Sequence, residues 1–243
     1  MNGTAERAIR LPTVPARNDA AAFVARAHRL DDTAVVRVRS RGVEAIELWV
    51  NNGFDVLAVR VVPGQVIGGG DIIADCSMLL AAIRAAQQVS AVTIDPGFGI
   101  DSAWRGALPP VDGWHHVDDV PARTVVRLAQ EGAEVARNQG SAHGPATSLL
   151  DQHVVEVTGT DPDGRDETVA ITMRAIFALT SMGFLRRADG GEVVESTDPA
   201  DIDDREPVRI RANRVWTRVD ARYGSVCLRR GQSFSLTVVP GAD

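Results

Sequence analysis

"WHHVDD", residues 114–119, is the stretch whose residue types are best suited to metal chemistry. Imidazole nitrogens and carboxylate oxygens bind divalent ions such as zinc or manganese, and a bound ion would support hydrolysis. However, His115 and His116 are adjacent, and adjacent side chains point apart in an extended chain. Further ligands would have to come from His143 or His153, whose distance the sequence does not give. We interpret the stretch as part of a polar linker and expect neither a metal nor a cofactor.

Three consecutive glycines, Gly68 to Gly70, form the feature that most resembles a phosphate-binding loop. A P-loop requires the pattern GxxxxGK[ST], but all 26 basic residues of this chain are arginines. A dinucleotide-binding fingerprint requires GxGxxG directly before a helix, whereas a short strand at 71–74 follows these glycines. We therefore predict a turn. Without lysine, Schiff-base and lysine-base mechanisms are excluded, and no GxSxG motif is present, so we expect a protein that is not an enzyme.

Length and composition limit the remaining classes. A chain of 243 residues is long enough for one large domain or for two that each bury a core. No stretch approaches the roughly 20 apolar residues that span a bilayer, and the start of the chain lacks the apolar core of a signal peptide. The two cysteines, Cys76 and Cys227, are far apart and form no CxxC pair. We expect a cytoplasmic protein that does not bind membranes.

The elements that must position these residues fall into two similar halves. In the first half, an amphipathic helix over 18–30 precedes three strands of alternating pattern, with turn residues at Gly42 and at 51–53. The glycine turn, a strand and a second helix follow. The strands are predicted at 33–40, 43–50, 54–62, 71–74 and 90–94, and the second helix at 75–88.

The second half repeats this order in outline. Residues 72–86 and 169–183 share one pattern, in which three strand residues, a capping residue (Asp75 or Thr172) and apolar pairs succeed one another. An acidic segment, 189–206, holds eight acidic residues and precedes arginine-rich strands. The predicted helices are 121–138 and 172–187, and the predicted strands are 152–159, 167–171, 207–223, 225–230 and 233–239.

This order of elements, and in particular "FDVLAVRVVPGQVIGGGDIIADCSMLLAAIRAAQQVSAVTI" (54–94), resembles sliding DNA clamps, the ring-shaped processivity factors of replication. The resemblance implies an α+β fold with two related clamp-like domains, each with an antiparallel sheet and two helices. It implies an N-terminal domain at 1–95, a linker at 96–120, and a C-terminal domain at 121–243 that carries the acidic loop 189–206. The acidic segment is longer than a clamp turn should be.

The resemblance also implies a function. It predicts a non-enzymatic, clamp-like protein of DNA replication or repair, which binds DNA through helix arginines and recruits partner proteins through its linker or outer surface. It further implies a homo-oligomer, which is a trimer of six domains if a ring closes. The alternative is a structural or regulatory interaction protein that uses the same fold without binding DNA.

Charge provides a partly independent argument. The four expected helices carry a net charge of +5, whereas the whole chain carries −6, so the remainder carries −11. Basic helices in an acidic chain favour phosphate contact, although arginines on helices are also common on solvated faces. The candidate DNA-binding residues on the helices are Arg26, Arg29, Arg84, Arg123, Arg127, Arg137 and Arg174.

The arginine-rich strands offer an alternative nucleic-acid surface. Arginines that alternate with an aromatic ring on one strand face bind phosphates and stack on bases. The competing interpretation is that the acidic segment 189–206 lies against these strands and neutralises them. The candidate residues are Arg209, Arg211, Arg214, Trp216 and Arg218. Phe98, Trp104 and Trp114 in the linker either bind partners or attach the linker to the domains.

Overall fold

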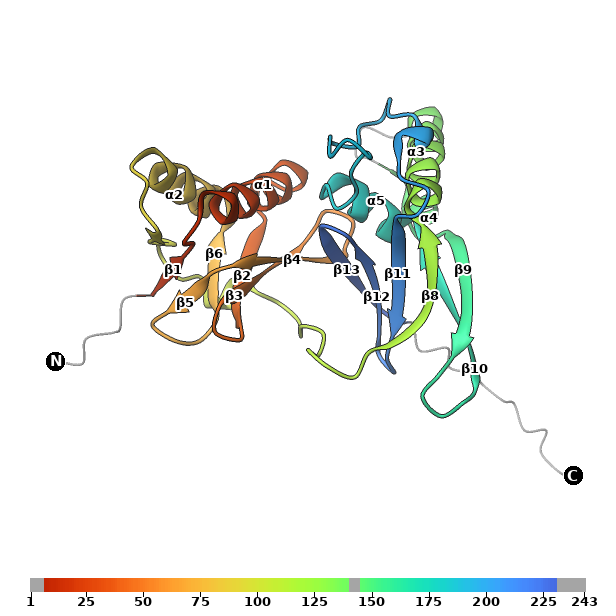
Figure 1. Ribbon diagram of the computed structural model, residues 1–243, viewed down its shortest axis with the longest axis horizontal. Coiled ribbons are helices and arrows are strands. Elements are labelled where there is room, and N and C mark those ends of the chain that lie inside the picture. Colours follow the sequence, from red (N-terminus) through yellow and green to blue (C-terminus); the bar gives the residue numbers. More distant parts are fainter. Residues whose placement is uncertain (1–6, 140–144, 231–243) are drawn as a thin grey trace, which may run out of the picture.

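One antiparallel sheet of eight strands runs through the whole molecule (Figure 1). The computed structural model describes residues 7–139 and 145–230. The first half of the chain supplies β6 (Ile72–Asp75), β2 (Val35–Arg41), β3 (Ala45–Asn51) and β4 (Leu57–Pro63). The second half supplies β13 (Gly224–Arg229), β12 (Trp216–Ala221), β11 (Pro207–Ala212) and β8 (His115–Pro121). The strands follow one another in this order across the sheet, so that β4 and β13 join the two halves.

The alternating pattern of the sequence decides which side chains enter the core. In β2, Val36 and Val38 are buried, while Arg37 and Arg39 point to the opposite face of the sheet. The three strands expected between 33 and 62 are confirmed. The glycine turn is also confirmed, because Gly68, Gly69 and Gly70 all have positive φ angles between 74° and 88°.

Four helices lie together on one side of the long sheet, in the upper part of Figure 1. They are α1 (Val14–Leu30), α2 (Cys76–Gln88), α3 (Ala122–Gln139) and α5 (Met173–Ser181); a single turn, α4 (Thr147–Leu150), precedes β9. The first helix begins four residues earlier than predicted. Thr13 caps it by accepting a hydrogen bond from the Ala16 amide, and Pro15 is tolerated in the first turn, where no intrahelical donor is needed.

The last helix ends earlier than predicted. The sequence favoured a helix as far as Arg187, but α5 stops at Ser181, and Gly183 turns the chain with a φ of +68°. A Cβ at Gly183 would lie 2.6 Å from Nε of Arg26, so this residue also permits close contact with α1. Arg186 and Arg187 therefore lie outside the helix.

Two small sheets complete the fold. The strands β5 (Gln65–Ile67), β1 (Ala8–Arg10) and β7 (Thr93–Ile94) form one, and the hairpin of β9 (His153–Thr160) and β10 (Asp166–Thr172) forms the other. Short 3-10 turns occur at η1 (Asp101–Ala103) and η2 (Pro199–Asp201). In each half a strand leads directly into the second helix, as the pattern predicts, and the fold is α+β with two related halves.

The halves are not equal copies. In the first half all four strands of the long sheet lie between α1 and α2, whereas in the second half β11, β12 and β13 follow α5. A single buried core nevertheless extends through both halves. At the junction, the rings of Phe23 and Phe184 stack with their centroids 6.2 Å apart. The two halves therefore pack as one unit.

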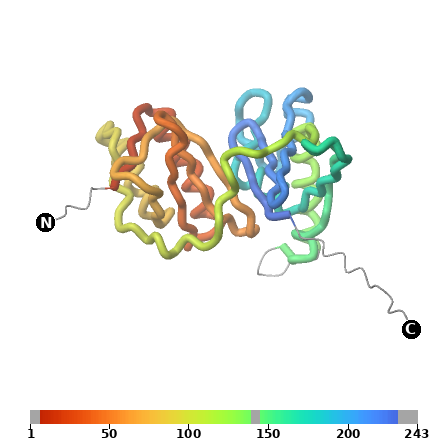
Figure 2. The backbone as a smooth tube through the Cα atoms, turned by 90° about the horizontal axis from the view of Figure 1, so that it is seen from below, coloured from red at the N-terminus to blue at the C-terminus, as the bar shows by residue number. Residues whose placement is uncertain are grey.

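The segment between the halves crosses the sheet before it enters β8 (Figure 2). The last residues of the predicted linker, from His115 onward, form β8, so strand structure begins before the expected boundary at 121. The strand predicted at 233–239 lies outside the described residues. Within the described part of the chain, no helix has the length and apolar character needed to cross a membrane.

Candidate nucleic-acid interface

The seven predicted helix arginines fall into three groups with different surroundings. Arg26 and Arg174 lie at the junction of the two halves. The side chain of Arg26 is 11% exposed and forms an ion pair with Glu192, and burial lowers its pKa. Arg174 lies 2.7 Å from Asp151 and donates a hydrogen bond of 2.9 Å to the carbonyl of Phe54. Both guanidiniums therefore hold the fold together rather than face solvent.

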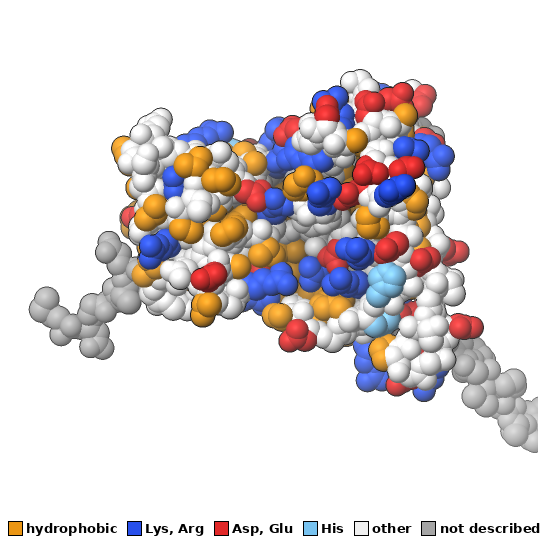
Figure 3. All heavy atoms as spheres, in the orientation of Figure 1, with side chains coloured by type: hydrophobic (Ala, Val, Ile, Leu, Met, Phe, Trp, Pro, Cys, Tyr) orange, Lys and Arg blue, Asp and Glu red, His pale blue; other side chains and the backbone are white. Residues whose placement is uncertain are grey.

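Arg123 and Arg137 hold the acidic segment 189–206 against α3. Arg123 donates hydrogen bonds of 3.0 Å to the carbonyls of Pro199 and Ile202, and Arg137 forms an ion pair with Glu195. Gln130 adds bonds to two further carbonyls of the segment. Acidic side chains accordingly gather around α3, at the upper right of Figure 3. The segment lies along α3. Among the described arginine-rich strands its one ion pair is that of Glu206 with Arg222 (3.2 Å), in the turn after β12, so the competing interpretation holds only at this turn.

The third group is exposed. Arg29 on α1, Arg84 on α2 and Arg127 on α3 all have exposed side chains. Arg127 lies 3.9 Å from Glu131 one turn along the helix, a separation at which an exposed pair contributes little. No ion pair of Arg29 or Arg84 occurs within residues 7–139 and 145–230. These three arginines can reach an external phosphate.

The opposite face of the sheet carries all four tryptophans of the chain. We call Trp49, Val59, Trp216 and Cys227, with Trp104, Trp114, Leu57 and Leu108 packed against them, the aromatic cluster. Arginines lie over each indole ring: Arg37 over Trp104, Arg39 over Trp49, Arg218 over Trp114 and Arg229 over Trp216, at 4.9–6.0 Å from the ring centroids. Trp104 and Trp114 thus attach the linker to the sheet, whereas Phe98 is 93% exposed.

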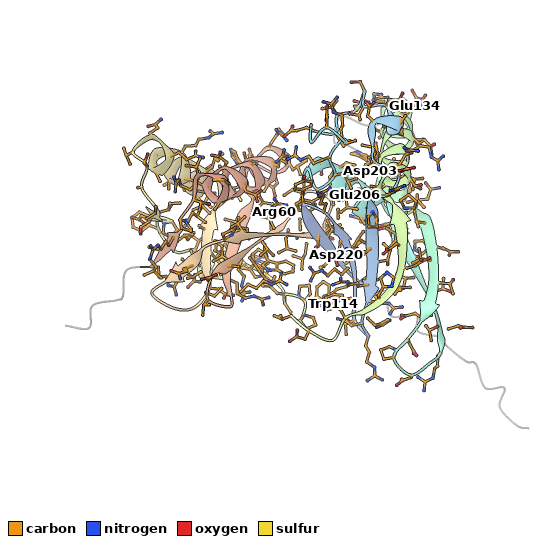
Figure 4. The ribbon with its side chains drawn as sticks, viewed as in Figure 1. Arg60, Trp114, Glu134, Asp203, Glu206 and Asp220 are labelled. Atoms are coloured by element: carbon orange, nitrogen blue, oxygen red, sulfur yellow. The ribbon has the colours of Figure 1, made fainter. Side chains whose placement is uncertain are left out.

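Two arginines of the predicted strand surface share one carboxylate of their own sheet. Arg211 and Arg218 lie 3.4 Å and 2.6 Å from the carboxylate of Asp220, which Figure 4 places among these strands. Asp203 and Glu206 lie nearer the helices in the same view. Trp216 is 7% exposed, so its ring is not accessible for base stacking. Arg209 and Arg214 remain exposed.

The two end strands of the long sheet are covered by other segments of the same chain. The amide of Ile100 donates a hydrogen bond of 3.1 Å to the carbonyl of Ile73 on β6. At the other end, β9 lies beside β8, and a Cβ at Gly159 would overlap the Val117 carbonyl. Covered edges resist pairing with a strand of another molecule.

The histidines of the 114–119 stretch engage different carboxylates. His115 Nε2 lies 2.5 Å from Glu167 on β10, and His116 Nε2 lies 2.8 Å from Asp119. Burial raises the pKa of Glu167, but the hydrogen bonds from His115 and Arg230 lower it further, so the net shift is downward. Within the described residues no three metal-ligating side chains converge, and His143 lies outside them. Burial raises the thiol pKa values of Cys76 and Cys227 to about 12, which removes thiolate reactivity at neutral pH.

Comparison with protein families accounts for both halves of the chain. Residues 109–233, slightly more than half of the sequence, match the model described as a domain of unknown function, DUF8185. The chain belongs to the DUF8185 family. Residues 4–106 match a second domain of unknown function, DUF8010. No curated protein matches the sequence.

Solved structures show which fold this DUF8185 protein has. The putative DNA polymerase III beta subunit of Eubacterium rectale is 11% identical with a TM-score of 0.55, covering 94% of this chain and 66% of that one. The sliding clamp of Bacillus subtilis is 12% identical with a TM-score of 0.52, covering 93% and 64%. The DNA polymerase III beta chain of Streptococcus pneumoniae is 14% identical with a TM-score of 0.51, covering 92% and 64%. The sliding-clamp fold is thus confirmed, and the DUF8185 chain spans about two thirds of the length of these clamps.

The carboxylates that pair with the helix arginines were not predicted from the sequence. Glu192 and Glu195 were counted within an acidic segment, but nothing in their spacing indicated contact with α1 and α3. Asp220 was likewise missed as the carboxylate that neutralises two strand arginines. Its period-two spacing from Arg218 within one strand was a usable signal, because residues two apart lie on one face.

Proposed function

We propose that this DUF8185 chain is a non-enzymatic, clamp-like DNA-binding protein of DNA replication or repair. The observation that carries the proposal is the position of α1, α2, α3 and α5 on one face of a sheet shared by both halves, with Arg29, Arg84 and Arg127 exposed on three of these helices. The confirmed clamp fold supports this assignment of the helix face.

Arginine suits the proposed role because its guanidinium stays charged and forms paired hydrogen bonds with phosphate oxygens. Contact with phosphates releases counterions, so affinity must fall as salt rises. For three phosphate contacts, we expect a slope of roughly −2 to −3 in a plot of log affinity against log salt. The net charge of −6 opposes binding elsewhere on the surface.

The test is double-stranded DNA binding at increasing salt, by fluorescence anisotropy. We expect Arg29→Ala, Arg84→Ala and Arg127→Ala together to abolish binding that the wild type shows at low salt. The control removes the same charge from exposed positions outside the helices and the acidic segment, by Arg7→Ala, Arg41→Ala and Arg165→Ala, and should retain binding. A third variant, Arg209→Ala with Arg214→Ala, tests the alternative strand surface. Wild-type protein that binds no DNA at low salt contradicts the proposal.

A second candidate function is a clamp-fold interaction protein that does not bind DNA. The acidic segment 189–206 favours it, because this segment occupies the face of α3 that would approach DNA. In this case the exposed Phe98 and the outer surface would bind partner proteins. Absence of DNA binding, combined with a protein partner whose binding Phe98→Ala abolishes, would establish this function instead.

The oligomeric state in solution distinguishes a closed ring from a clamp-like chain that forms no ring. A trimer of two-domain chains, with domains at 1–95 and 121–243, would close a six-domain ring, and we propose a cytoplasmic location for either form. The covered edges of β6 and β8 favour a monomer, because no free strand is offered at either end of the described sheet. Light scattering across a concentration series distinguishes the two: a trimer supports ring closure, and a persistent monomer excludes it.

A further inference from the structure

A cleft of about 420 Å³ lies at the junction of the two halves, where β4 begins and β13 ends. Its walls come from five separate parts of the chain: the loop 51–57, the linker at 105–107, Asp151 before β9, the start of α5, and the strands β12 and β13. None of Arg29, Arg84 and Arg127 lines it, so it is distinct from the proposed DNA contact. Its volume falls within the range typical of small-molecule sites.

Two guanidiniums that line this cleft, those of Arg105 and Arg229, belong to exposed side chains. Arg229 lies over the Trp216 ring, 4.9 Å from its centroid. Arg105 lies between Trp104 and Leu108, both packed in the aromatic cluster, and the positive φ of Gly106 (98°) sets the turn beside it. Within the described residues, neither Arg105 nor Arg229 has a carboxylate at ion-pair distance. Arg105, Arg174 and Arg229 thus give the cleft three positive charges against the two carboxylates of Asp55 and Asp151.

The opposite wall carries hydrogen-bond donors beside two carboxylates, Asp55 and Asp151. Arg174 is fixed by Asp151 at 2.7 Å and by the Phe54 carbonyl at 2.9 Å. Thr172 is the N-cap residue of α5, yet its hydroxyl caps no helix amide. Its Oγ1 is buried and has no hydrogen-bond partner. A buried hydroxyl without a partner is unfavourable, and a donor at a helix N-terminus is well placed to bind an anion.

We propose that this cleft binds the terminal phosphate of a small organic phosphate, between Arg105 and Arg229 and with Thr172 as a further donor. The two guanidiniums without a paired carboxylate outweigh the single carboxylate of Asp55, and their N–H groups match the oxygens of a phosphate. The cavity is larger than a phosphate group needs, so the organic part lies beside Leu57 and the edge of Trp216.

The test is isothermal titration of the full chain with inorganic phosphate and with ribose 5-phosphate, using ribose as the uncharged control. We expect saturable one-to-one binding of both phosphates, tighter binding of ribose 5-phosphate, and none of ribose. Arg105→Ala with Arg229→Ala should weaken binding by at least roughly tenfold, because each removes a charge-assisted hydrogen bond. Thr172→Val should weaken it several-fold.

The controls separate this site from nonspecific attraction and from the DNA proposal. Arg41→Ala with Arg165→Ala removes the same charge from exposed positions outside the cleft and should leave phosphate affinity unchanged. The Arg29, Arg84 and Arg127 triple variant should also bind phosphate normally. Arg105→Ala alone tests the site if loss of Arg229 disturbs Trp216. Failure of the wild type to bind either phosphate saturably, or equal binding by the double variant, overturns the proposal.

Discussion

The helix faces of the two halves share one fold but differ in what covers them. On the first half, Arg29 and Arg84 of α1 and α2 are exposed and form no ion pair among the described residues. On the second half, the acidic segment lies on α3, and Arg123 and Arg137 bind it. The net charge of a helix therefore does not report its accessible charge, because a guanidinium bound to a neighbouring carbonyl or carboxylate is not free to bind phosphate.

The largest expected effect is a loss of stability at the junction, and it tests whether the two halves unfold together. Phe184 is 1% exposed and stacks on Phe23 across the junction. We expect Phe184→Ala to reduce the free energy of unfolding by about 3–5 kcal/mol, because it leaves a cavity between the halves. Urea unfolding, with hydrogen exchange followed in both halves, should show one shifted transition.

Phe98→Ala is the matched control for that variant. Its ring is 93% exposed, so its replacement should change stability by less than about 0.5 kcal/mol. If Phe184→Ala weakened protection in the second half alone, the two halves would be independent units and their helix faces could not be compared as parts of one surface.

A smaller effect distinguishes two arginines on the same helix. Arg26 is largely buried against Glu192 and Gly183, whereas Arg29 is exposed. We expect Arg26→Ala to destabilise the protein by about 1–2 kcal/mol, since it leaves polar groups without partners, although the exposure of Glu192 limits the loss. Arg29→Ala should stay within about 0.5 kcal/mol of the wild type in thermal or urea unfolding. Equal effects of the two substitutions would contradict the assigned roles.

Neutralising two glutamates of the acidic segment 189–206 should make the helix faces of the two halves more alike in charge. Glu192→Gln with Glu195→Gln removes the carboxylates that face Arg26 and Arg137, so these guanidiniums gain favourable interaction with DNA. We expect a rise of roughly threefold to tenfold in DNA affinity, measured by anisotropy at low salt. Glu44→Gln with Glu156→Gln removes two exposed carboxylates from other surfaces and serves as the control. A gain no larger than that of the control would mean that the segment does not compete with DNA.

The smallest effect concerns acid stability. The pKa of Glu167 lies below its ordinary value of 4.5, since hydrogen bonds from His115 and Arg230 outweigh the opposing effect of burial. This carboxylate therefore stabilises the fold fully above pH 4.5, and its contribution is lost as the pH falls through the lowered pKa. In the first half, hydrogen bonds from Ser77 and the Met78 amide lower the pKa of Asp75 in the same way, against burial.

Glu167→Gln should accordingly flatten the fall in stability below pH 4.5, in urea unfolding measured across the acid range. Asp75→Asn should likewise remove the contribution that the Asp75 carboxylate makes to the pH dependence of stability. If neither substitution changed the pH profile, the acid sensitivity of the protein would arise from other carboxylates.

Local patterns determined much of this protein. In β2 the alternation separates the core residues Val36 and Val38 from the arginines between them, because successive strand residues point to opposite faces. In β3 five consecutive residues are buried, since the aromatic cluster covers the second face. Asp75 was predicted as the cap of α2, and the three glycines were predicted as a turn, from residue chemistry alone. The order of these elements was sufficient to predict the sliding-clamp fold.

Only the tertiary structure decided which charges are free. Arg26 and Glu192 are separated by 166 positions in the chain, and Arg123 and Ile202 by 79, so no local rule brings them together. The same holds for the cleft at the junction, where Arg105, Thr172 and Arg229 converge from three distant segments. Sequence patterns encode the period of an element and the face on which a side chain lies. The partner on that face depends on how the elements pack, and in this fold packing turns four of the seven helix arginines into structural contacts and leaves three exposed.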